Sequence, residues 1–236
     1  MIHNGLCENS SVTEITLRTR MSSDEEVSTF LTSPLVRWVS SLVPHLTREV
    51  SWLSLSQGVL FAETLSSLDP GLDLELDPEP SDTSARAKNL RLIVTAIKKY
   101  YSDSLHQMLM LPLPSARELA LIPPTSRSLS QMEDLLLLLL GAAVQSDQKQ
   151  DFIIAIKNLP LETQHGIVDK IRVVTDNPNM VWNKDLNNPT TMEESQRDAM
   201  YQVLVTHAAR YLGRGRVIKS SGNHNSSGSR KVMFSN

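Results

Sequence analysis

The sequence has little of several features that would point to particular classes of protein. Its 236 residues include one cysteine, Cys7, which excludes an internal disulfide and a cysteine-based metal cluster. Aromatic residues make up only 5% of the chain. The longest leucine run, Leu135–Leu140, is far shorter than the roughly 20 apolar residues that a membrane-spanning helix needs. The cysteine usage favours a reducing compartment, and we expect a cytoplasmic protein.

The sequence also lacks an excess of either charge. It has 23 Lys and Arg residues against 26 Asp and Glu residues, which gives a formal net charge of -3. No global electrostatic field attracts a polyanion, so nucleic acid is not an expected partner, and any basic surface must be local. The N-terminus lacks the basic start and apolar core of a signal peptide. We therefore expect a soluble chain with no direct membrane insertion.

Motifs for enzymatic chemistry are missing as well. The sequence contains no GxGxxG, no phosphate-binding loop, no HExxH and no GxSxG. Its six histidines are scattered along the chain, and acidic pairs such as Glu133 with Asp134 fall on predicted helix surfaces or first turns, where carboxylates meet the helix dipole favourably. The sequence therefore predicts no enzyme, no cofactor and no metal site.

What the sequence does have is apolar residues at helical spacing. The leucine run is apolar on every side of a helix, which is typical of the central helix of a soluble helical core. The fold class that we predict is all-α, with these helices: Pro34–Leu42, a helix starting near Ser54 or Ser56 and ending before Asp69, Ser84–Ser104, a helix from Ser128 or Ser130 to Gln145, Gln148–Lys157, Leu161–Val174 and Met192–Leu212.

The remaining segments read as ends and connections. Residues 1–24 are polar without an apolar period and predict a disordered leader, and residues 213–236 carry Arg and Lys but no acid and predict a basic disordered tail. Three prolines between residues 69 and 82 favour a surface loop, although alternating Leu72, Leu74 and Leu76 leave a strand as an alternative. Residues 115–128 read as another variable connection.

Single residues add local expectations. Asp147 with Gln150 resembles a capping box and predicts the start of a helix there. Trp38 and Phe61 lie on apolar helical faces and are expected in the core. Met108 and Met110 fit either a core or an adaptable binding surface. Trp182 lies between two Asn-Pro breakers, where it either fills a groove or docks a loop.

Several motifs together resemble the N-terminal Hook domain of the Hook and girdin family of cytoskeletal adaptors, and look closer to girdin. The resemblance spans about Val27 to Val174 and rests on Ser33–Val39, Lys88–Leu90, Ile97–Tyr101, Met110–Pro114 and Leu135–Ile156. It implies a calponin-homology-like helical bundle with additional C-terminal helices. The domain is expected over residues 25–176, followed by a linker and helix over 177–212.

The resemblance also implies a partner. In this family the domain precedes a dimerising coiled coil and binds a short amphipathic helix of the dynein light intermediate chain, which links cargo or signalling complexes to microtubule-based transport. A cytoskeleton-associated location is therefore expected. No sustained heptad repeat follows Val174 in this sequence, so we do not expect this chain to dimerise.

The helix after the leucine run is the candidate binding element. Gln148, Phe152 and Ile156 form one stripe at a spacing of four, with Ile153 in the adjacent row. A polar Gln148 at the end of the stripe suggests that its apolar face is partly exposed. We hypothesise that it forms one wall of a groove for a partner helix, with Leu161–Val174 as the other wall. The alternative is that the same residues pack against the chain's own Met192–Leu212 helix.

A second hypothesis is direct binding to microtubules or actin. Lys98, Lys99 and the basic tail would meet an acidic filament surface. Exposed charges are screened within about 8 Å at physiological ionic strength, so this binding should weaken steeply with salt.

Overall fold

A computed structural model describes residues 22–43, 50–175, 177, 180–183, 194, 201, 202, 204 and 205. Contacts divide the chain into the units Met1–Asn187 and Asn188–Asn236, and every element below belongs to the first unit. The basic tail, residues 1–21 of the predicted leader, and all but five residues of the predicted Met192–Leu212 helix lie outside the described residues. The predicted end of the leader at residue 24 is too late, because Ser23 caps a helix that begins at Asp24.

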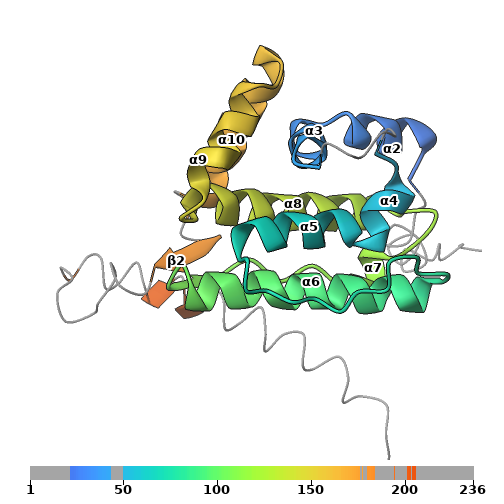
Figure 1. Cartoon of the computed structure of the whole chain (residues 1–236), viewed down its shortest axis with the longest axis horizontal. Helices are drawn as coiled ribbons and strands as arrows, with labels where there is room; N and C mark the ends of the chain where they lie inside the picture. The colour runs from blue at the N-terminus through green and yellow to red at the C-terminus, as the bar shows by residue number, and fades with distance from the viewer. Residues whose placement is uncertain are drawn as a thin grey trace, which may run out of the picture. The chain divides into compact units, whose positions relative to one another are not determined.

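The centre of the fold is α8 (Ser126–Gln145), which contains the leucine run. All six leucines are buried, as expected for a helix that is apolar all round. Figure 1 shows α8 running across the middle of the unit, with α6 along one side and α2 and α3 on the other. The predicted start near Ser128 or Ser130 is too late, because Thr125 is the N-cap and forms a capping box with Ser128.

Four short helices make up the N-terminal part: α2 (Asp24–Leu31), α3 (Pro34–Ser41), α4 (Trp52–Gln57) and α5 (Val59–Leu68). Pro34 lies at the start of α3, as predicted. The prediction of a single helix beginning near Ser54 or Ser56 is wrong, because two helices, α4 and α5, cover this segment. Ser51 caps α4 earlier, and Gly58, with a φ of 85°, ends α4 and begins α5 in a conformation that favours glycine.

The long helix α6 (Thr83–Asp103) confirms the predicted amphipathic helix and connects two other parts of the fold. At its C-terminal end the Tyr101 hydroxyl donates a hydrogen bond to the Leu138 carbonyl of α8 over 2.8 Å. Nearer its start, the Asn89 amide donates to the carbonyls of Gln57 and Asp77 and accepts from the Asp77 N–H. Asn89 thereby holds the acidic loop, which is a loop as predicted.

Two small features were not predicted. The connection over residues 115–128 contains α7 (Ala116–Leu119), and β1 (Gln107–Leu109) pairs antiparallel with β2 (Val181–Asn183), so that Met108 lies opposite Trp182. Trp182 therefore belongs to a strand and not to a loop. The all-α class holds for the described chain, since this two-stranded ladder of three residues on each side is its only sheet.

The candidate binding elements are α9 (Lys149–Lys157) and α10 (Leu161–Thr175), close to their predicted bounds. The expected capping box of Asp147 with Gln150 is wrong, because Gln148 is the N-cap and its side chain makes no capping bond. α10 packs closely on α8 and α3: a methyl group on Gly141 would lie 2.6 Å from Val174, and one on Gly166 would lie 2.6 Å from Pro34. These contacts fix the position of α10.

None of the helices in the described ranges is long and apolar enough to span a membrane.

Candidate helix-binding surface

The predicted stripe on α9 faces mainly inward. Phe152 is 4% exposed and Ile156 is 8% exposed, because α9 packs against α8, α3 and α10. Ile153 is half-buried, and Gln148 is exposed as expected. The expected exposure of the stripe is therefore wrong for Phe152 and Ile156. A role of these four residues in binding a partner stays a prediction.

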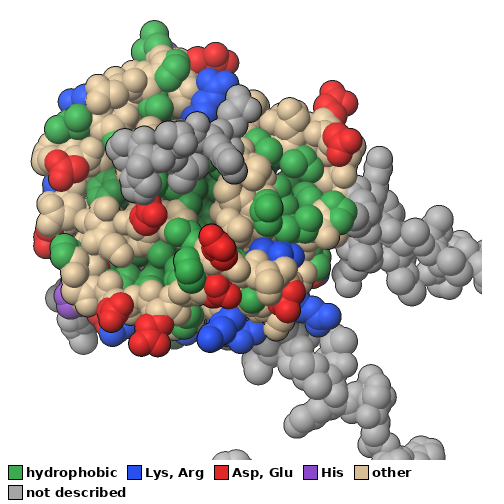
Figure 2. Space-filling model, turned by 45° about the vertical axis from the view of Figure 1, so that its right-hand side comes forward, with side chains coloured by type: hydrophobic (Ala, Val, Ile, Leu, Met, Phe, Trp, Pro, Cys, Tyr) green, Lys and Arg blue, Asp and Glu red, His purple; other side chains and the backbone are tan. Residues whose placement is uncertain are grey.

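α9 exposes a large apolar side chain that the sequence pattern did not predict. Ile154 is 54% exposed, and Leu161, at the start of α10, is 67% exposed. Val168 and Val173 on α10 are also exposed. Every residue from Phe152 to Ile156 is apolar, so the pattern alone could not show which side of the helix faces solvent. Figure 2 shows apolar side chains in more than one cluster on a single face of the molecule.

Ile154 lies at a cleft between α9 and the end of α3. The cleft has a volume of about 370 Å³ and is lined by Ser41, Asp151, Ile154, Ala155, Asn158 and Leu159. Its apolar members come from α9 and from the turn that follows it. The cleft therefore presents a small apolar surface with polar groups at its edges.

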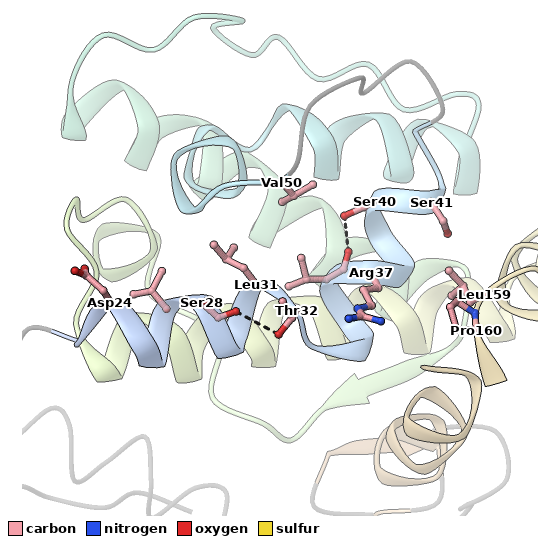
Figure 3. Close-up of a pocket in the computed structure, with 12 residues that line it drawn as sticks. Asp24, Ser28, Leu31, Thr32, Arg37, Ser40, Ser41, Val50, Leu159 and Pro160 are labelled. Carbon is pink, nitrogen blue, oxygen red and sulfur yellow. Dashed lines mark hydrogen bonds between the residues drawn. The ribbon is translucent and has the colours of Figure 1, made fainter. Parts of the chain in front are cut away.

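A larger cleft of about 790 Å³ lies between α2, α3 and the turn at Leu159 and Pro160 (Figure 3). Its apolar lining comprises Val27, Leu31, Val36, Val50, Leu159 and Pro160, and its polar lining comprises Asp24, Ser28, Thr32, Arg37, Ser40 and Ser41. The hydroxyls of Thr32 and Ser40 donate to the carbonyls of Ser28 and Val36 within their own helices. Their hydrogen-bonding needs are met inside the fold.

The turn between α9 and α10 is held in place by a side chain of α10. The Gln164 amide donates to the Lys157 carbonyl over 3.1 Å and to the Leu159 carbonyl over 2.7 Å. Further along α10, Lys170 forms an ion pair with Glu133 of α8. These contacts hold in place the turn whose Leu159 lines both clefts, and they hold α10 against α8.

Two groups with shifted pKa values lie on α8 and α6 and do not line either cleft. Burial raises the pKa of Asp134, and the neighbouring Glu133 carboxylate raises it further. Burial also raises the pKa of the Tyr101 hydroxyl, which is hydrogen bonded inside the core. Among the described residues no three His, Cys, Asp or Glu side chains gather where they could hold a metal ion. What this surface offers is apolar contact area with polar edges.

The described part of the chain is thus a helical bundle in which α3 and the α9–α10 turn border two clefts. A comparison with protein families then identifies it: the sequence model described as the HOOK domain matches residues 31–173, and the chain belongs to this family. The predicted resemblance is confirmed, and so is the mostly helical fold. The calponin-homology-like arrangement stays what the family resemblance implies. The family is one of non-catalytic adaptors.

Individual relatives agree with this assignment. The chain is 30% identical over 198 residues to Protein Daple of Xenopus laevis, covering 80% of this chain and 9% of that protein. It is 30% identical over 189 residues to girdin of Mus musculus, covering 78% of this chain and 10% of that protein. It is 28% identical over 148 residues to the Protein Hook homolog of Branchiostoma floridae, covering 58% of this chain and 19% of that protein. The chain thus spans about a tenth of the first two.

One solved structure is similar, the conserved domain of the mouse HOOK1 protein. It is 23% identical, covers 61% of this chain and 91% of that chain, and has a TM-score of 0.48. Daple and girdin each match a larger share of this chain than the Protein Hook homolog does, which fits the prediction that the chain is closer to girdin than to Hook.

Proposed function

We propose that this chain is a non-enzymatic cytoskeletal adaptor domain that binds an amphipathic helix of the dynein light intermediate chain. The partner helix would dock against α9 and α10 and link cargo or signalling complexes to microtubule-based transport in the cytoplasm. The observation that carries the proposal is Ile154, a large apolar side chain that is 54% exposed beside a cleft.

The contact would involve two layers of α9 residues. Ile154 and the edge of Ile153 would touch the partner, and Gln148 would meet polar groups at the rim. Phe152 and Ile156 lie beneath and fix the orientation of the helix. Leu161 and Val168 are exposed apolar side chains of α10 and would add contacts with the partner. Burying a fully exposed isoleucine contributes about 1.5–3 kcal/mol, so the exposed half of Ile154 would contribute about 1 kcal/mol.

A binding titration tests this proposal directly. A labelled light-intermediate-chain helix peptide would be titrated with the wild-type chain and with Ile154→Ser, Ile153→Ala and Gln148→Ala. Leu53→Ser on α4 is the matched control, because Leu53 is 47% exposed and α4 packs against α5 and α6. We expect Ile154→Ser to weaken binding by about fivefold or more, and Leu53→Ser to leave it unchanged.

The two buried residues of α9, Phe152 and Ile156, need a separate experiment. Phe152→Ala and Ile156→Ala remove core contacts, so they lower stability by about 2–5 kcal/mol as well as altering the surface. Their affinities count only at a temperature where circular dichroism shows a folded chain. Equal affinity of all folded variants for the peptide, or no binding by the wild type, would refute the proposed docking on α9.

A second candidate function, direct binding to microtubules or actin, is favoured by one face of α6. Lys88, Arg91, Lys98 and Lys99 share that face, are exposed, and form no ion pair within the described part of the chain. At 1.5 Å per residue, Lys88 and Lys98 are about 15 Å apart along the helix. The acidic loop held by Asn89 partly offsets this charge.

Co-sedimentation with filaments at low and high salt separates the two functions. Filament binding through α6 predicts a loss of co-sedimentation in Lys98→Glu with Lys99→Glu, a further loss without residues 213–236, and a steep dependence on salt. The helix-binding function predicts that the same double variant binds the helix peptide like the wild type.

A further inference from the structure

The two clefts beside α3 are adjacent. Ser41 and Leu159 line both the 370 Å³ cleft at Ile154 and the 790 Å³ cleft between α2 and α3. Because they share these two residues, the two clefts are neighbours, and together they extend from α9 past the end of α3 to the side of α2. We call the two clefts together the α2–α9 trough.

The trough has one cationic side chain in its lining, Arg37. The other charged groups are Asp24 and Asp151, which belong to its two different clefts. Arg37 is exposed, and within the described part of the chain its guanidinium has no ion pair or side-chain hydrogen bond. Figure 3 shows Arg37 between Thr32 and the Leu159–Pro160 turn, at the edge of the larger cleft.

Apolar side chains lie beside Arg37 in the larger cleft. Leu159 and Pro160 lie across the cleft and remain accessible, whereas Val36, which precedes Arg37, is buried. A partner that covers these apolar groups would remove water from the guanidinium as well. A desolvated guanidinium without a counter-charge is costly, whereas a carboxylate binds it through two parallel hydrogen bonds.

We propose that the α2–α9 trough selects a partner helix that carries a carboxylate beside its apolar stripe, and that Arg37 binds this carboxylate. This inference rests on the proposed function and extends it from α9 to α2 and α3. The occupant is one amphipathic helix whose apolar side chains enter the trough near Leu31, Leu159 and Ile154. Its acidic group lies near the middle, opposite Arg37.

The charges of the trough make the selection specific. A lysine at the middle of the partner would meet Arg37 with the same sign, and a glutamine would leave the guanidinium without a counter-charge. Lysines toward the ends would face Asp24 or Asp151. A partly desolvated arginine–carboxylate pair changes affinity by about threefold to tenfold relative to a neutral group.

The test uses three designed 18-residue amphipathic helices with the same leucine stripe. The residues that flank the stripe at its centre are glutamate in the first, glutamine in the second and lysine in the third. Each is titrated with the wild-type chain, Arg37→Gln and Arg37→Glu. Arg91→Glu, on the solvent face of α6, is the control for the same change of net charge.

We expect the wild type and Arg91→Glu to prefer the glutamate helix over the lysine helix, Arg37→Gln to lose most of that preference, and Arg37→Glu to reverse it. An order of affinities that does not depend on residue 37 would overturn the proposal, and so would a failure of the wild type to bind any of the three helices. Arg37 has no partner to lose within the described chain, so its variants are expected to fold, and their melting temperatures check this.

The light-intermediate-chain peptide is run in parallel to separate the two ideas. If that peptide binds and Ile154→Ser weakens it, while residue 37 has no effect on the designed helices, the α9 site stands and the selective trough fails. If the peptide does not bind but the designed helices follow the charge of residue 37, the trough stands and the named partner is wrong.

Discussion

Gly141→Ala tests how closely the central helix must approach its neighbours. A methyl group on this α8 residue would lie 2.4 Å from the Tyr101 hydroxyl and 2.6 and 2.9 Å from the two methyl groups of Val174. All three distances are below van der Waals contact. Tyr101 and Val174 are both fully buried, and the tyrosine is hydrogen bonded to Leu138, so neither can move aside without loss.

The size of the effect follows from opposing contributions. Overpacking a core costs about 1–3 kcal/mol, and displacing the Tyr101 hydroxyl from the Leu138 carbonyl costs about 1 kcal/mol more. Alanine is favoured over glycine within a helix by about 1 kcal/mol. We therefore expect the free energy of unfolding to fall by about 1–3 kcal/mol, which lowers the melting temperature by several degrees.

Urea denaturation measures this change, with two comparisons. Gly71→Ala is the control, because the nearest atom to its methyl group would be a carboxylate oxygen of Asp69 at an ordinary 3.4 Å. Tyr101→Phe removes the closest clash, so adding it to Gly141→Ala should cost less than it costs in the wild type. A Gly141→Ala protein as stable as the wild type would refute the close packing of α6, α8 and α10 described above.

Three further predictions concern the loop, the pH dependence and the oligomeric state. Asn89→Ala removes three hydrogen bonds to Gln57 and Asp77; we expect a loss of about 2–3 kcal/mol and faster amide exchange at Asp77, while the exposed Thr95→Ala serves as the control. The pKa of Asp134 is raised in the folded state, which means that the folded chain binds this proton more tightly than the unfolded chain does. The ionised carboxylate therefore destabilises the folded chain, and stability falls as the pH rises from the unfolded pKa through the folded pKa. Asp134→Asn should therefore stabilise the chain at neutral pH and lose this advantage below about pH 4 in urea titrations; an equal gain at both pH values would contradict the assignment. Sedimentation of the chain should show a monomer, since no heptad repeat follows Val174, and a stable dimer would contradict this.

The sequence predicted the parts of the fold that are set by long apolar patterns. Trp38 and Phe61 are fully buried as expected, and the leucine run forms the central helix. These predictions succeed because a stripe, or a run that is apolar on every side, has few alternatives to burial. The alternating leucines of the acidic loop are half-buried without forming a strand, because side-chain contacts with the core replace strand pairing there.

The parts that were missed depend on tertiary contacts. The ladder between β1 and β2 has three residues in each strand, which is too short to show a period. At α9 the sequence predicted the helix itself but not which of its apolar residues face solvent. Phe152 and Ile154 differ little in chemistry, and only the positions of α3, α8 and α10 decide which of them is exposed. Arg37 could not be selected either, because the trough exists only once α2, α3 and the α9–α10 turn are assembled.

Methyl NMR of the isoleucine-labelled chain is the most direct test of the central claim that the face of α9 around Ile154 receives a partner helix. On addition of the light-intermediate-chain helix peptide, the methyl resonances of Ile153 and Ile154 should shift, whereas those of Ile93, which is buried on α6, should stay in place. Peptide binding that leaves Ile154 unchanged, or that shifts only residues away from α9 and α10, would contradict the claim.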